Sequence, residues 1–486
     1  MASPLKKLAS DTAIYGITHS LGRFLNFLLV PLYTSVFSLE QYGVVSVYYA
    51  LVAFAIVVLT YGFETAFFNF SRNQDPTVVF STGIRSILAT SALFVVVGIL
   101  SRQQIANFLE YPDQSHFVVL FVFILALDAI NALPFAWLRF SNHSARFGII
   151  RLAGIALNIG FNLLFLIAIP RMIAAGQTVS WYSSDFGIGY IFLSNLLSSG
   201  LTTLMLLPQF SGIRNGFDRD LWKTMMQYAR PLIWVGLAGI VNETLDRILL
   251  KKMLPVELAD SEIAVYSAFY KISIVITLAV QSFRFAAEPF FFEHSKSDQP
   301  QKTYARIMHY FVVVVAFLFL ATSVFAEPLG RLFIRRPEYF DHPQWRALVP
   351  ILLLANLFLG IVFNLNIWYK LKNLTGIGRN ISLIGAAITI VLNLLLIPII
   401  GILGSAITTL ITYGTMAVVS YSVGQKHYPI PYNLKIIGFY IVFAIILYGL
   451  NQWMQAWLGT IILPGIVVVI AYSAVVYFLE GPPKKG

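Results

Sequence analysis

The 486-residue sequence contains no cysteine, and charged residues make up only 11% of it. Without cysteine there is no disulfide framework, no thiolate-based zinc or iron–sulfur site, and no thiol nucleophile. A soluble globular protein carries about 25% charged residues, so this chain lacks the polar surface that a protein needs in water. Hydrophobic residues account for 58% of the sequence, which favours a protein that uses lipid as its solvent.

Long polar segments are missing as well, so no extramembrane domain is available to house an active site. A helix needs about 20 mostly apolar residues to cross the roughly 30 Å hydrocarbon core of a bilayer. The sequence provides fourteen such stretches, and we predict an all-α polytopic membrane protein. The approximate limits of the spans are residues 12–37, 42–70, 78–100, 116–140, 145–170, 186–208, 222–253, 262–290, 303–332, 345–371, 377–397, 402–423, 434–450 and 457–479.

The net charge of +11 reflects where the basic residues lie. Basic residues that flank apolar runs mark the cytoplasmic ends of membrane helices, so we expect no nucleic-acid partner. If the N-terminus is cytoplasmic, the inner loops hold more lysine and arginine than the outer ones. We therefore expect a multi-pass membrane protein with both termini on the cytoplasmic side.

Two halves of the sequence resemble each other. Residues 25–29 match residues 245–249 at an offset of 220, and residues 45–48 match 266–269 at an offset of 221. The sharpest match pairs Asn162-Leu163-Leu164 with Asn393-Leu394-Leu395 at an offset of 231. Slowly rising offsets indicate two homologous halves with small insertions. We predict a six-helix bundle over residues 1–210, a second over 211–425 with pseudo-twofold symmetry to the first, and helices 13–14 with a tail over 426–486.

Short motifs rich in Gly, Pro, Tyr and Asn recur near the start of the chain and in its second half. They are Tyr15-Gly16, Arg23-Phe24-Leu25-Asn26, Pro31-Leu32-Tyr33-Thr34, Tyr42-Gly43, Tyr61-Gly62-Phe63-Glu64-Thr65, Lys372-Asn373-Leu374-Thr375, Asn393-Leu394-Leu395, Ile397-Pro398 and Gly401-Ile402-Leu403-Gly404-Ser405-Ala406. These motifs resemble those of the Wzx-type polysaccharide transporters, or oligosaccharide flippases, which belong to the superfamily that includes the multidrug and toxic-compound extruders and the lipid II flippase. The resemblance implies two six-helix bundles around a V-shaped cavity, alternating access, and a location in the bacterial cytoplasmic (inner) membrane.

Ionisable residues deep in the spans are candidate site residues, because each is costly in lipid. Arg23, Lys271 and Arg284 form the candidate anion site, since arginine forks match phosphate oxygens. The 220 offset sets Arg23 opposite Glu243, so the first half is cationic where the second is anionic. Glu243 and Arg247 also have the spacing of a salt bridge within one helix.

Carboxylate, amide and hydroxyl oxygens are the ligands that a hard cation prefers. Asp246, Glu243, Thr389, Asn393 and Thr409 are the candidates for a coupling cation, in a pattern similar to the sodium site of the lipid II flippase relatives. An acidic position of that family is Asn393 here and an amide position is Thr389, which puts sodium in doubt and leaves a proton open. We expect no other metal and no cofactor.

Aromatic residues can stack on sugar rings, although most of the 24 tyrosines and 8 tryptophans belong to the core or the interfacial belt. Tyr48, Tyr49 and Tyr61 are the candidates for contacting a glycan, together with Asn26.

The preferred function is a flippase, and not an enzyme, that moves a polyprenyl-diphosphate-linked oligosaccharide to the outer leaflet for surface polysaccharide biosynthesis, coupled to an ion or to the membrane potential. Its partners are this lipid-linked oligosaccharide and membrane lipids. We expect a monomer, with the enzymes of polysaccharide assembly as candidate associates.

One alternative is a multidrug exporter on the same fold, although a cavity centred on Arg23 and Lys271 would repel cationic drugs. Another is a polysaccharide polymerase or ligase, which would need the large catalytic loop that is missing. The sequence does not identify the glycan, its length or the coupling ion.

Overall fold

A computed structural model describes residues 21, 24–25, 27–210, 216–294, 298–372 and 374–481. Over these residues the chain is helical, without a β-strand. It divides into two compact units, Met1–Lys251 and Lys252–Gly486. Eleven of the described helices are long and apolar enough to cross a membrane, and a bent pair of helices makes twelve. The prediction of an all-α multi-pass membrane protein is confirmed.

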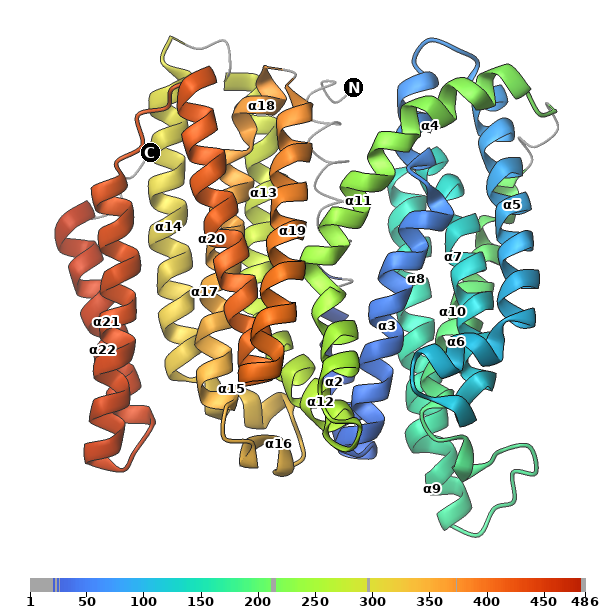
Figure 1. Ribbon diagram of the computed structural model, residues 1–486, viewed down its shortest axis with the longest axis horizontal. Coiled ribbons are helices and arrows are strands. Elements are labelled where there is room, and N and C mark those ends of the chain that lie inside the picture. The colour runs from blue at the N-terminus through green and yellow to red at the C-terminus, as the bar shows by residue number, and fades with distance from the viewer. Residues whose placement is uncertain are drawn as a thin grey trace. The chain divides into compact units, whose positions relative to one another are not determined.

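The first unit consists of helices that run up and down between two ends (Figure 1). Its elements, with one π-helical and two 3-10 turns, are α2 (Leu29–Val36), α3 (Leu39–Thr60), α4 (Phe63–Phe70), α5 (Pro76–Leu100), α6 (Arg102–Phe108), η1 (Pro112–Gln114), α7 (Ser115–Phe140), α8 (Ser144–Leu163), η2 (Leu164–Ala168), α9 (Ile169–Ala174), η3 (Ser184–Phe186), α10 (Gly189–Leu206) and α11 (Arg219–Met253).

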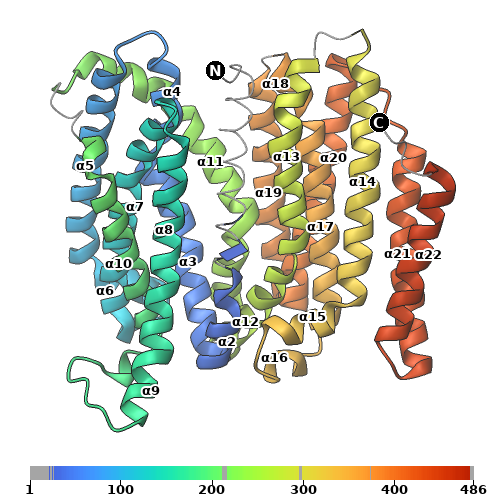
Figure 2. The same cartoon turned by 180° about the vertical axis from the view of Figure 1, so that it is seen from behind.

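The second unit has the same up-and-down arrangement, with α21 and α22 at one edge beside α14 (Figure 2). Its elements are α12 (Val256–Ile272), α13 (Ile274–His294), α14 (Pro300–Val324), α15 (Ala326–Phe333), α16 (Glu338–Asp341), α17 (Trp345–Leu365), α18 (Ile367–Leu371), α19 (Thr375–Ile400), α20 (Ile402–His427), α21 (Leu434–Leu458) and α22 (Ile462–Glu480).

The twelve candidate spans coincide with predicted spans 2 to 6 and 8 to 14. The first predicted span, residues 12–37, lies largely outside the described residues. The seventh, residues 222–253, lies in α11, where Arg230 and Glu243 shorten the uncharged stretch. The helix count of fourteen therefore stays a prediction for these two spans.

Local sequence explains where the helices begin and break. Ser38 and Gln41 form a reciprocal capping box at the start of α3, and Asp75 caps α5 by accepting from the Thr77 backbone N–H at 2.9 Å. Tyr61 and Gly62 both adopt left-handed backbone conformations, which separates α3 from α4 within one span. Between α12 and α13 the chain bends by 47°.

The unit boundary at Lys251 falls 41 residues beyond the predicted bundle boundary at residue 210 (251 minus 210). The reason is that the first half of α11 packs in the core of the first unit, where Leu221, Met225 and Ala229 join a cluster with helices α3 to α5 and α7. The functional division into residues 1–210, 211–425 and 426–486 stays a prediction.

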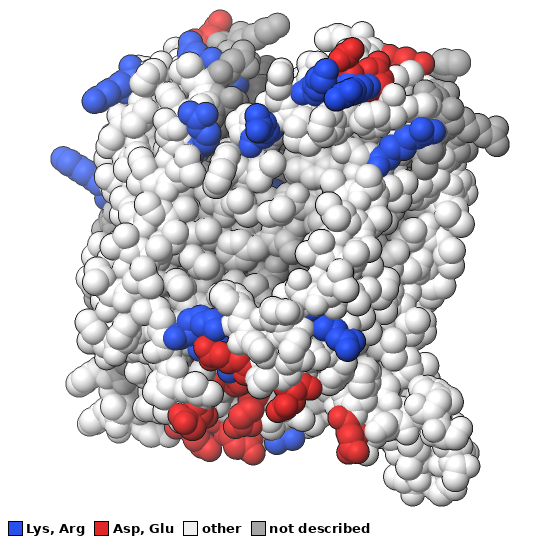
Figure 3. Space-filling view, turned by 45° about the vertical axis from the view of Figure 1, so that its right-hand side comes forward, with Lys and Arg blue, Asp and Glu red and all other residues white. Residues whose placement is uncertain are grey.

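Charged side chains on the visible face gather near the two ends of the helices, and the band between them is uncharged (Figure 3). Large apolar side chains are exposed on several helices, among them Leu100, Ile399 and Phe478, which are more than 70% exposed. An uncharged band with exposed apolar side chains is what a lipid-facing surface requires.

Candidate functional site

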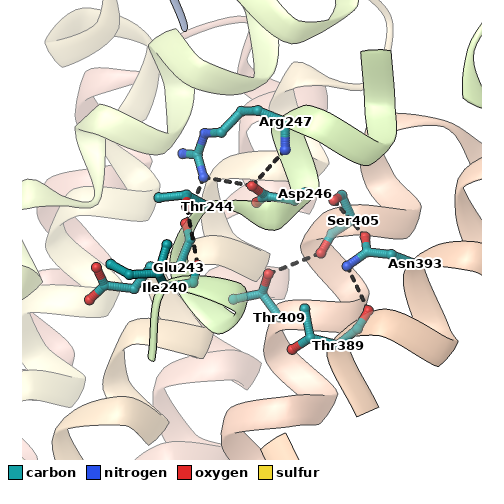
Figure 4. Close-up of polar contacts among 9 residues, drawn as sticks. All are labelled: Ile240, Glu243, Thr244, Asp246, Arg247, Thr389, Asn393, Ser405 and Thr409. Carbon is teal, nitrogen blue, oxygen red and sulfur yellow. Dashed lines mark hydrogen bonds and ion pairs between the residues drawn. The ribbon is translucent and has the colours of Figure 1, made fainter. Parts of the chain in front are cut away.

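Charged and polar side chains meet in the second half of α11 (Figure 4). Asp246 and Arg247 are both buried, and the Arg247 guanidinium donates to the Asp246 carboxylate at 2.7 Å. The same guanidinium donates to the backbone carbonyl of Glu243 at 2.7 Å. The expected Glu243–Arg247 salt bridge is therefore wrong, because the arginine binds the main chain of Glu243 while the Glu243 residue is exposed.

The same contacts involve the backbone of α11. The backbone N–H of Arg247 donates to the Asp246 carboxylate at 2.8 Å, and the carbonyl of Glu243 accepts from the Arg247 guanidinium at 2.7 Å. Pro231 in the same helix has no N–H for the helical hydrogen bond and is a usual cause of a bend. Figure 1 shows α11 curved along its length.

The second unit holds a neutral polar network between α19 and α20 (Figure 4). The Asn393 amide donates to the Thr389 carbonyl at 2.8 Å, and its oxygen accepts from the Ser405 hydroxyl at 2.8 Å. Thr409 donates to the Ser405 carbonyl at 3.0 Å, and the Thr389 hydroxyl lies 3.2 Å from that of Thr412. The structure thus brings together three of the five predicted cation ligands, Thr389, Asn393 and Thr409, in a cluster without formal charge. Ser405 and Thr412 were missed by the sequence reasoning.

The first unit repeats this arrangement. The Asn162 amide donates to the Asn158 carbonyl at 2.8 Å, four residues earlier in α8, and its oxygen accepts from the Tyr33 hydroxyl at 3.0 Å. Asn158 and Thr389 are related by the same 231 offset as Asn162 and Asn393 (389 minus 158). The matching contacts support the predicted internal repeat. Asn158 could have been found from the sequence, because the 231 offset relates it to Thr389, which was a candidate site residue.

Lys271 and Arg284 lie on the two parts of the bent span α12–α13. Lys271 stands near the bend, two residues before Ser273, and Arg284 lies on α13 with its guanidinium 5.1 Å from the centre of the Phe363 ring. Thirteen residues of helix extend about 20 Å, so the two residues lie at different depths along this span. Arg23 and Asn26, the other predicted contacts for the substrate, lie outside the described residues.

The three predicted glycan tyrosines lie inside the first unit. Tyr48 is stacked against Tyr111 and Phe121, at ring-centre distances of 5.8 and 4.8 Å. The Tyr49 hydroxyl accepts from the Asn195 amide at 3.2 Å. Tyr61 belongs to the hydrophobic core and donates to the Ser86 hydroxyl at 2.7 Å. The two faces of Tyr48 are thus covered by aromatic rings, and its glycan contact stays a prediction.

A polar triad that the sequence did not suggest fixes the last two helices to the bundle. The Glu480 carboxylate at the end of α22 lies 2.9 Å from the His309 ring of α14 and accepts from the Tyr440 hydroxyl of α21 at 2.7 Å. Tyr472 of α22 donates to the Val313 carbonyl of α14 at 2.9 Å. These bonds connect three helices at positions far apart in the sequence.

Comparison with known proteins agrees with this architecture. The structure is similar to the lipid II flippase MurJ in an inward closed conformation, with a TM-score of 0.73 at 13% identity over 95% of this chain and 98% of that one. It is also similar to an inward-facing multidrug resistance MATE family transporter of the MOP superfamily, with a TM-score of 0.65 at 12% identity over 83% and 94%. The Vibrio cholerae MATE transporter VcmN in the bent form gives a TM-score of 0.52 at 16% identity over 90% and 98%.

At these identities the structural likeness establishes the fold and no more. Among curated proteins, none matches the sequence. The family described as polysaccharide biosynthesis protein matches residues 8–295, which is more than half of the chain. The match includes residues 8–251 of the first unit, the bend after α12 and the residues of α11 described above. The chain is therefore a member of the polysaccharide biosynthesis protein family, with the fold of the MOP superfamily.

Proposed function

We propose that the protein is a flippase that moves a polyprenyl-diphosphate-linked oligosaccharide across the bacterial inner membrane for surface polysaccharide biosynthesis. It works by alternating access, with both termini in the cytoplasm, and it is not an enzyme. The observation that carries the proposal is membership of the polysaccharide biosynthesis family on a fold shared with a lipid II flippase.

The helices α21 and α22 favour a lipid-linked substrate. The structural match to the lipid II flippase covers 95% of this chain, which leaves about 24 of the 486 residues without a counterpart. The helices α21 and α22 with their turn span residues 434–480, or 47 residues, so the unmatched residues are too few to include the whole pair. Part of this pair therefore has a counterpart in a protein that handles a lipid. On the outside of the pair, large apolar side chains such as Trp457, Ile470 and Phe478 are exposed, as a surface along which a polyprenyl tail passes requires.

The basic residues of the second unit suit a diphosphate that changes position during transport. Lys271 and Arg284 lie about 20 Å apart along α12–α13, so they can bind it one after the other at two depths. Both side chains are half-buried, so an anion at either position is partly desolvated and the attraction is stronger than in water. Arg23 remains the proposed contact from the first unit.

For coupling we propose a proton or the membrane potential in preference to sodium. Asp246 already has the Arg247 guanidinium at 2.7 Å, so its charge is balanced without an external ion. In the second unit the Asn393 amide oxygen already accepts from the Ser405 hydroxyl, and its nitrogen donates to the Thr389 carbonyl. Sodium would have to compete with these internal bonds for the same oxygens, which makes a weak site.

A multidrug exporter is the alternative function, and the MATE neighbours are the observation in its favour. Against it, these transporters leave more of the chain unmatched, and the candidate cavity residues Lys271 and Arg284 are basic. A cationic drug would be repelled there, whereas a diphosphate would be attracted.

Depletion of the protein in its host, followed by mass spectrometry of the lipid-linked intermediates, tests the proposal. We expect one polyprenyl-diphosphate oligosaccharide to accumulate on the cytoplasmic side. Reintroduced Arg284→Ala should fail to clear it, whereas Arg146→Ala, at an exposed position in the first turn of α8, should clear it. An unchanged set of intermediates, together with increased sensitivity to cationic drugs, would favour the exporter.

A further inference from the structure

Asp128 lies in the middle of α7 (Ser115–Phe140), thirteen residues after its first residue and twelve before its last. At 1.5 Å per residue, about 18 Å of helix separates it from either end. α7 is a candidate membrane span, so the carboxyl group lies at the depth where an ionisable side chain is most costly. None of the anion-binding or cation-binding roles proposed above uses this residue.

The surroundings of Asp128 are polar but uncharged. The Ser199 hydroxyl of α10 donates to the carboxyl oxygen at 2.7 Å. Asn131, one turn later on the same face of α7, donates to the Ser199 backbone carbonyl at 3.5 Å. Two side chains of α7 therefore converge on one serine of α10, and among the described residues the carboxyl group makes no salt bridge.

A second observation shows that this cluster lacks a hydrogen-bond donor. Asn131 is only 4% exposed, and its amide oxygen has no hydrogen-bond partner in the described structure. A buried acceptor without a donor costs about 1–3 kcal/mol. A proton on the Asp128 carboxyl group supplies a donor, directly or through one bound water molecule. If Asp128 were ionised, its carboxylate and the Asn131 amide oxygen would be two acceptors with one donor, the Ser199 hydroxyl, available to both.

The helices packed against α7 bring few charges to this point. The ionisable groups within electrostatic reach of Asp128 in the described structure are Tyr49 of α3 and Arg151 of α8. Tyr49 is neutral and accepts from Asn195. Arg151 is exposed, and its guanidinium lies 5.4 Å from the centre of the Phe135 ring instead of bonding to the carboxylate. Glu64 of α4 is already paired with Arg139.

We propose that Asp128, with Ser199 and Asn131, forms a proton-binding site in the first unit. The carboxyl group is protonated in the described state. During the transport cycle it releases its proton to water, and Asp128 gains one negative charge. The site needs no sodium and no cofactor. The role in transport rests on the proposed flippase function, whereas proton binding itself does not.

Infrared difference spectroscopy of the protein in lipid nanodiscs tests proton binding directly. We expect the C=O stretching band of a protonated carboxyl group that disappears as the pH rises. Asp128→Asn should remove this band, Asp128→Glu should retain it at a shifted position, and the control Asp113→Asn, exposed at the end of the span, should leave it unchanged. Ser199→Ala should shift the band, because the hydrogen bond to the carboxyl group is lost. A band that persists in Asp128→Asn, or a carboxylate ionised throughout, would overturn the proposal.

Transport in proteoliposomes tests the coupling. An imposed pH difference should change the flipping rate of a fluorescent polyprenyl-diphosphate oligosaccharide by up to about tenfold per pH unit in the wild type, the change in proton activity, and in Asp113→Asn. The same pH difference should have no effect on Asp128→Asn. A gradient response that survives in Asp128→Asn would refute the coupling role. If the wild type flips nothing, the flippase function fails, and the infrared result still decides whether Asp128 binds a proton.

Discussion

Replacing Arg247 by glutamine should remove one partner of a buried ion pair. The Arg247 guanidinium and the Asp246 carboxylate are 2.7 Å apart, and their side chains are 10% and 7% exposed. With an effective dielectric constant of about 20, a pair at this distance attracts by about 6 kcal/mol before desolvation is counted. Removing one partner of a buried pair costs about 3–5 kcal/mol in practice. We expect Arg247→Gln to lose this much of its free energy of unfolding.

A small cation should recover part of that loss. Sodium that binds beside the Asp246 carboxylate of the variant at ten times its dissociation constant would add about 1.4 kcal/mol. The wild type, with the guanidinium in place, should show no such gain. Reversible unfolding by SDS in mixed micelles, in sodium chloride and in choline chloride of equal ionic strength, measures both effects.

The matched control is Lys223→Gln, which removes an exposed ion pair to Asp220 at 3.0 Å on the same helix. Exposed pairs contribute about 0–1 kcal/mol, so this variant should unfold close to the wild type and ignore sodium. If Arg247→Gln also unfolded within about 0.5 kcal/mol of the wild type, the pair would not be a balanced buried charge. If sodium stabilised the wild type as much as the variant, the argument against sodium coupling would fail.

Three further predictions concern packing and polar contacts within each unit. Asn162→Leu leaves a buried tyrosine hydroxyl without its acceptor and should cost about 1–3 kcal/mol of unfolding free energy; an unchanged value would mean that the hydroxyl finds another partner. Glu480→Gln removes the charge facing His309 and should raise amide hydrogen exchange in α22 while α20 stays protected; equal exchange in both would contradict the docking role. Gly360→Ala places a Cβ 2.6 Å from a phenylalanine ring and should cost about 1–3 kcal/mol, whereas Gly414→Ala, which meets open space, should cost much less.

Most of the fold could be predicted because lipid leaves the chain few choices. Every backbone polar group in the bilayer must be bonded within its own segment, so an apolar run of sufficient length is a helix. The repeat could be predicted because matching residues recur at slowly rising offsets, and the structure shows Asn162 and Asn393 each bonded to the carbonyl four residues earlier. Such a contact lies within one helix, where sequence spacing fixes the geometry.

Contacts between helices could not be predicted in the same way. Asp128 was recognisable as an intramembrane acid, but its partner Ser199 lies 71 residues further on, and serine is common in membrane helices. Spacing also failed within α11, since it pairs Arg247 with Glu243 four residues earlier, whereas the guanidinium bonds to the carboxylate of the adjacent Asp246. The guanidinium binds the Asp246 carboxylate because that carboxylate is buried beside it, whereas Glu243 is exposed. Burial is a property of the packed unit, which the sequence does not display.

The internal repeat bears on why a proton site belongs in one unit and not in both. Asp128 is related to Asn356 of α17 by an offset of 228 (356 minus 128), between the offsets of 221 and 231 found on either side. Asn356 also lies at mid-helix; it is buried and bonds to neighbouring hydroxyls, donating to Ser273 at 3.3 Å and accepting from Thr277 at 3.4 Å. The second unit thus shows that a neutral amide at this position can form the hydrogen bonds that hold the neighbouring helices together. Asp128→Asn gives the first unit the chemistry of the second, so it should fold normally, and any lost response to pH is then attributable to the missing proton.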